Sequence, residues 1–136
     1  MFPVLQSLRK DTLVSFLAER CSLTDAQLDT ILLSQVQGNL KDRARLRDKK
    51  KVSPGAFLRT LRQGQENVEA CIYTMLLLGY LGLVEVEDLQ RLARSSELLS
   101  RVKESAPSME AVSRLTQAME ELAQGFSRRK KQKFIV

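Results

Sequence analysis

The sequence contains no histidine and no tryptophan, and only two cysteines, three prolines and six glycines among its 136 residues. Histidine is the commonest general base and a frequent metal ligand. Its absence removes most catalytic arrangements and, with two isolated cysteines, leaves no usual ligand set for zinc. Neither a glycine-rich phosphate loop nor a nucleophile elbow is present. We therefore expect a protein that is not an enzyme and that holds no metal or other cofactor.

The two cysteines and the hydrophobic runs indicate the cellular location to be expected for the protein. Cys21 and Cys71 lie 50 residues apart, each inside an apolar helical pattern, which predicts buried free thiols in preference to a disulfide. The longest apolar run, residues 72–84, has 13 residues and is too short to span a bilayer. The N-terminal segment lacks the features of a signal peptide. We expect a cytoplasmic protein that does not bind a membrane.

Positive charge is concentrated in residues 38–62, where nine Lys or Arg stand against two Asp, so this stretch carries +7 in a chain whose net charge is +6. A second basic segment, residues 128–136, carries +5 and no acid. Residues 1–37 sum to −1 and residues 63–127 to −5. Such segregation is typical of a protein that binds a polyanion while its body does something else, such as dimerise. A solvated loop and a solubilising tail are the alternatives.

Hydrophobic spacing predicts an all-α fold, with five to six helices in a single compact domain. That domain covers residues 1–126 and contains a basic loop at 39–52, while residues 127–136 form a flexible basic tail. The expected helices cover residues 3–20, 24–37, 54–63, 65–82, 85–103 and 108–125. Thr24 and Gln27 have the spacing of a capping box, and Ser53 followed by Pro54 marks another helix start.

The segment at residues 65–83 is the most hydrophobic of these helices. It is apolar nearly all round between Ile72 and Leu81, so we expect it to be the most buried helix, either at the centre of the core or in a dimer interface. Gly64, just before it, is expected to break or loosen the helical pattern. Met109 and Met119 are expected to fill the core.

Residues 16–33, FLAERCSLTDAQLDTILL, resemble a helix-turn-helix. Ala18 is small where a second helix would pack closely, the turn spans three or four residues, and Leu28 and Ile31 would face back toward the first helix. The resemblance implies DNA binding and transcriptional regulation. A plain helical hairpin is the alternative.

The helix expected at residues 54–63 has better chemistry for DNA than the helix that follows Thr24, because Asp25 and Asp29 on the latter would face phosphate. Free amides at the helix start, with Ser53, Gly55 and the preceding lysines, predict a phosphate site. The predicted nucleic-acid contacts are Lys41, Arg43, Arg45, Arg47, Lys49, Lys50, Lys51, Ser53, Arg59, Arg62, Arg128, Arg129, Lys130, Lys131 and Lys133.

These observations predict a small helical nucleic-acid-binding protein that prefers duplex DNA and forms a homodimer through residues 65–83. One alternative is a non-enzymatic subunit of a larger complex whose basic loop grips an acidic protein partner. The other is an RNA-binding subunit, although few aromatic residues are present to stack on single-stranded bases.

Overall fold

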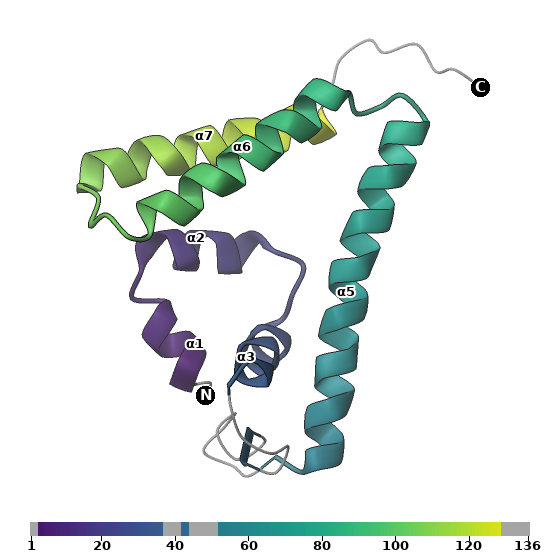
Figure 1. Ribbon diagram of the computed structural model, residues 1–136, viewed down its shortest axis with the longest axis vertical. Coiled ribbons are helices and arrows are strands. Elements are labelled where there is room, and N and C mark those ends of the chain that lie inside the picture. Colours follow the sequence, from purple (N-terminus) through teal and green to yellow (C-terminus); the bar gives the residue numbers. More distant parts are fainter. Residues whose placement is uncertain (1–2, 37–41, 44–51, 129–136) are drawn as a thin grey trace. The chain divides into compact units, whose positions relative to one another are not determined.

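The computed structural model describes residues 3–36, 42–43 and 52–128. Within these ranges the chain forms six α-helices and no strand, which confirms the all-α class (Figure 1). The helices are α1 (Pro3–Leu8), α2 (Thr12–Arg20), α3 (Asp25–Ser34), α5 (Pro54–Tyr80), α6 (Val86–Val102) and α7 (Met109–Ser127). Two compact units, Met1–Cys71 and Ile72–Val136, make up the fold, and α5 contributes residues to both.

The segment expected to be one helix over residues 3–20 is two helices, so that prediction was wrong. Asp11 begins α2 as its N-cap, because its carboxylate accepts hydrogen bonds from the amides of Leu13 at 2.9 Å and Val14 at 3.4 Å. An Asp side chain that satisfies these amides competes with continuation of the helix through the same residues. The hydrophobic period alone could not show this break.

Helix α3 packs against α1, and two polar contacts join α3 to α1 and to Arg9 just after it. The Asp29 carboxylate is fully buried and accepts a hydrogen bond from the amide of Leu5 at 3.1 Å. That amide lies in the first turn of α1, where backbone donors have no partner within the helix and a negative charge is stabilising. At the surface, Arg9 and Asp25 form an ion pair with a nitrogen–oxygen distance of 2.5 Å. The capping box predicted for Thr24 and Gln27 is confirmed.

The core of the first unit forms where α3 meets α5. Leu33 and Phe57 are 0% and 1% exposed and pack together, with Val52 against them. Gly64 is buried as well, and a Cβ added there would lie 3.0 Å from Cδ1 of Ile31. Gly64 therefore does not break the helix, contrary to expectation, but allows α3 and α5 to approach closely.

In the second unit α6 and α7 pack along each other, as Figure 1 shows for the green and yellow helices. Gly82, with φ of +74°, turns the chain after α5, in the left-handed region that favours glycine. Glu85 and Asp88 form a reciprocal cap at the start of α6, and the Ser108 hydroxyl caps α7. Helix α7 continues past the expected stop at Gly125 and ends at Ser127.

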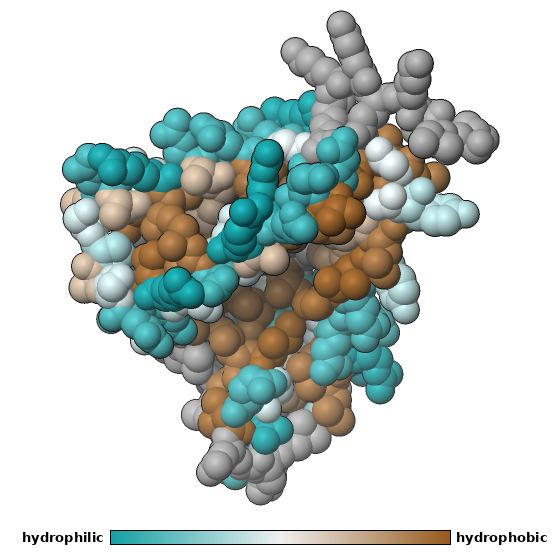
Figure 2. Space-filling view, turned by 45° about the horizontal axis from the view of Figure 1, so that its top comes forward, coloured by the Kyte–Doolittle hydropathy of each residue, from teal (hydrophilic) through white to brown (hydrophobic). Residues whose placement is uncertain are grey.

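Helix α5 is continuous over 27 residues, and its second half is far more exposed than the sequence predicts. Its only buried residues are Phe57 and Gly64. The prediction that residues 65–83 form the most buried helix was therefore wrong. Hydrophobic side chains reach the surface in several places between hydrophilic ones, in brown and teal in Figure 2. The exposed large hydrophobic side chains of residues 65–80 are Val68, Ile72, Tyr73, Leu76, Leu77 and Tyr80.

Two further burial predictions also fail. Cys21 and Cys71 are both exposed free thiols and not buried ones. Met109 is 90% exposed, because it stands in the first turn of α7, whereas Met119 is half-buried as expected for a core-filling residue. Cys71 and Met109 lie on exposed faces of α5 and α7, and the helical period alone does not show which face is exposed, whereas Cys21 follows the end of α2 as its C-cap.

Candidate nucleic-acid interface

The start of α5 is organised by Ser53, as the sequence predicts. The Ser53 hydroxyl oxygen accepts a hydrogen bond from the Ala56 amide at 3.1 Å, and its carbonyl accepts from the Phe57 amide at 2.9 Å. Pro54 follows as the first helical residue, where its missing amide proton costs nothing. This local chemistry favours a helix start at Pro54.

The same cap limits the anion-binding capacity of this helix start. Pro54 has no amide proton and the Ala56 amide is already satisfied by Ser53. Among the described residues, the Gly55 amide is the first-turn donor that remains available for a phosphate. Gly55 is exposed, and a Cβ built on it would meet no atom within 4 Å. The Ser53 hydroxyl can still donate its own proton to an oxygen of the same phosphate.

Arg59 and Arg62 lie one to two turns further along α5 and are both exposed. Being three residues apart, they stand on neighbouring positions of the helix surface. Neither forms an ion pair with a carboxylate within the described part of the chain, whereas Arg101 pairs with Glu97 at 2.5 Å and Arg114 with Glu110 at 2.6 Å. Their guanidinium groups can therefore bind an external anion without first breaking an ion pair to another described residue.

Arg43 has a structural contact that the sequence did not predict. It is half-buried, in helical conformation together with Asp42, and its Nε donates a hydrogen bond to the carbonyl of Val36 at 2.8 Å. Val36 follows the C-terminal end of α3, where a cation is favoured. Arg43 thus holds its segment against α3, and only its remaining guanidinium protons are available for a phosphate.

Arg128 is the C-cap residue of α7 and is exposed, with its amide donating to the Gln124 carbonyl at 2.8 Å. The remaining predicted contacts lie outside the residues that the structure describes. They are Lys41, Arg45, Arg47, Lys49, Lys50, Lys51, Arg129, Lys130, Lys131 and Lys133. The structure brings together Ser53, Gly55, Arg59 and Arg62 on one stretch of α5.

The polar residues of α3 are occupied within the protein. Thr30 is fully buried, and its hydroxyl donates to the Ala26 carbonyl at 2.6 Å. Oε1 of Gln27 accepts from the Thr24 amide at 3.1 Å and from Nδ2 of Asn67 at 2.8 Å. Asp29 points into the protein and not toward solvent. The first turns of α5 therefore offer more free hydrogen-bond donors than α3 does.

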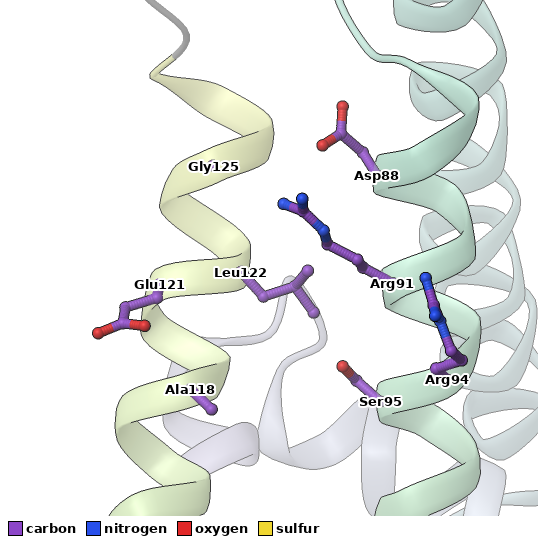
Figure 3. Close-up of a pocket in the computed structure, with 8 residues that line it drawn as sticks. All are labelled: Asp88, Arg91, Arg94, Ser95, Ala118, Glu121, Leu122 and Gly125. Carbon is purple, nitrogen blue, oxygen red and sulfur yellow. The ribbon is translucent and has the colours of Figure 1, made fainter.

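A cleft of about 350 Å³ lies between α6 and α7 (Figure 3). The Arg91 guanidinium and the Ser95 hydroxyl point toward α7, whereas the Glu121 carboxylate points away from α6. None of the predicted nucleic-acid contacts lines this cleft. Sequence reasoning did not single out Arg91 or Arg94, which line it three residues apart on α6. That i, i+3 spacing is the signal that could have found them.

The described residues contain no group of three or more His, Cys, Asp or Glu side chains that could hold a metal ion. Within the same residues, no helix combines the length and the hydropathy that crossing a bilayer requires. Comparisons with protein-family models, with curated proteins and with solved structures found no match.

Proposed function

We propose that this chain is a non-enzymatic nucleic-acid-binding protein that favours duplex DNA and contacts phosphates through residues 41–62 and its basic C-terminal segment. One observation carries the proposal: exposed Arg59 and Arg62, without carboxylate partners among the described residues, follow a helix start at which Gly55 is also exposed. The sequence places Lys49, Lys50 and Lys51 directly before that start.

Electrostatics supports a polyanion as the ligand. Phosphate contacts release counterions from the nucleic acid. A cluster of basic side chains therefore gives a binding affinity that falls steeply as the salt concentration rises. Duplex DNA is favoured over single strands because few aromatic side chains are present on which bases could stack. Transcriptional regulation is the setting that the helix-turn-helix resemblance implies.

The test is a binding titration by fluorescence anisotropy against duplex DNA, single-stranded DNA and structured RNA at two salt concentrations. We expect tightest binding to the duplex. Replacing Arg59 and Arg62 together by Ala should lower the affinity about tenfold or more and reduce the salt slope by about 2, since each lost phosphate contact removes about 0.9.

The matched control replaces Arg101 and Arg114 by Ala, which removes the same charge from two arginines paired with Glu97 and Glu110. This control should retain the wild-type salt slope. Equal losses in both variants would show that only net charge matters and would reject the site on α5.

Charge reversal at Lys49, Lys50 and Lys51 should abolish binding while helicity by circular dichroism is unchanged. No binding to any of the three nucleic acids at about 100 mM salt, where non-specific binders still register, would favour an acidic protein partner instead.

A further inference from the structure

The last turns of α5, within the second unit, expose five large hydrophobic side chains. Their exposed fractions are 58% for Ile72, 70% for Tyr73, 63% for Leu76, 56% for Leu77 and 90% for Tyr80. Met75 and Leu78, on the other side of the helix, are half-buried. The helix therefore has one half-buried face and one exposed apolar face.

The size of this apolar face can be compared with half of a protein–protein interface. With each aromatic side chain offering 150–250 Å², Tyr73 and Tyr80 alone expose roughly 240–400 Å². Three aliphatic side chains add to this area, and each partner contributes about 800 Å² to a standard interface. A typical monomer rarely shows one apolar patch of this size. The two tyrosines add the residue type that most often anchors interfaces.

Charge indicates which partner fits. No charged residue occurs between Glu69 and Glu85, in a chain whose net charge is +6. Two copies of a basic chain repel each other unless they meet through a neutral surface, and this is the longest neutral stretch of the sequence. An acidic or basic partner, by contrast, would find no complementary charge within this stretch.

We propose that Ile72, Tyr73, Leu76, Leu77 and Tyr80 form an isologous interface between two copies of this chain. In such an interface the same patch of each copy meets its equivalent about a two-fold axis, so the apolar face is self-complementary. The proposal does not depend on nucleic-acid binding. It specifies the residues of the homodimer that the sequence predicts through residues 65–83.

The experiment is the molar mass of the full chain by light scattering after size-exclusion chromatography, at about 100 μM chain, which is well above the micromolar Kd that a standard interface of modest quality gives. The wild-type chain should have twice the 15.4 kDa of one copy. Leu76→Asp should halve this mass, because each dimer would bury two carboxylates against each other. A wild-type chain that is monomeric under these conditions overturns the proposal.

Val86→Asp is the matched control, since Val86 is 64% exposed on α6 and Leu76 is 63% exposed on α5. This control should remain dimeric. Dissociation of both variants to the same extent, or of neither, also overturns the proposal. Circular dichroism should show wild-type helicity for both, and Tyr80→Ser provides a second interface variant, expected to halve the mass, if Leu76→Asp loses helicity.

Discussion

The two parts of α5 differ in both charge and burial. In residues 54–71, Phe57 and Gly64 are buried against α3, and charged side chains such as Arg59 and Arg62 are on the outside. Residues 72–80 contain no charge and no buried residue. The less hydrophobic half is thus the better buried one. Hydrophobicity shows that a helix face favours burial, but not which neighbouring element buries it.

The buried half has its cover because α3 supplies a complementary surface. Leu33 packs on Phe57, Ile31 lies against Gly64, and Asn67 donates to Gln27 at 2.8 Å. In the part of the chain that the structure describes, the open half of α5 has no fully buried residue, whereas α6 and α7 pack on each other. The difference in burial between the two halves therefore reflects the elements packed against each half and not helix propensity. Substitutions at single residues can test this.

The largest effect should come from Phe57, the anchor of the buried half. Phe57→Ala removes a side chain that is 1% exposed and leaves a cavity against Leu33, so the free energy of unfolding should fall by about 3–5 kcal/mol. Leu58→Ala, next along the helix but 45% exposed, should cost less than about 1 kcal/mol. Urea denaturation of both variants measures the difference.

A similar small loss at both positions would contradict the burial of Phe57. It would mean that the first half of α5 is no better anchored than the second, and the contrast between the two halves would disappear. The slope of the urea transition should stay constant, since a change there reports altered compactness and not altered contacts.

A smaller effect should separate the two glycines inside α5. Gly79→Ala should raise the free energy of unfolding by about 0.5–1 kcal/mol, because Ala favours helix and a Cβ there meets no atom within 4 Å. Gly64→Ala should instead lower it by about 1 kcal/mol, since crowding typically costs 1–3 kcal/mol. The added Cβ would lie 3.0 Å from Cδ1 of Ile31 and 3.3 Å from Cβ of Gln27. Thermal denaturation at one chain concentration gives both values. Equal stabilisation by the two changes would show that α3 and α5 do not approach closely at Gly64.

Local chemistry allowed much of the fold to be predicted from the sequence. The capping box of Thr24 and Gln27, the helix starts at Ser53 and Ser108, and the all-α class all follow from side chains that satisfy nearby backbone groups. Such contacts span three or four residues, so a single sequence contains all the information that they need. The candidate site benefits from the same rule, because its position on α5 depends on where that helix starts.

Contacts between distant residues could not be predicted in this way. Asp29 is fully buried because it accepts the Leu5 amide, 24 residues away, and no local pattern identifies that pairing. The sequence instead suggested that Asp29 would face phosphate. The burial of α5 could not be predicted for the same reason, because tertiary packing decides which element covers each face of a helix.

The smallest structural effect, but a direct test of exposure, concerns the two thiols. Cys71 lies at the boundary between the two halves of α5, with its sulfur 3.3 Å from the Ser22 hydroxyl oxygen, and Cys21 lies in the turn after α2. Because both are exposed, a disulfide reagent should modify two thiols in each native chain. The rate of modification should lie within about tenfold of the rate measured for the unfolded chain. Cys21→Ser and Cys71→Ser should each leave one reactive thiol. Buried thiols would react only after unfolding, which marginal stability makes slower by at least about a thousandfold. Protection of Cys71 alone would show that this thiol is covered together with the first half of α5, and protection of both would restore the burial that hydrophobic periodicity predicts.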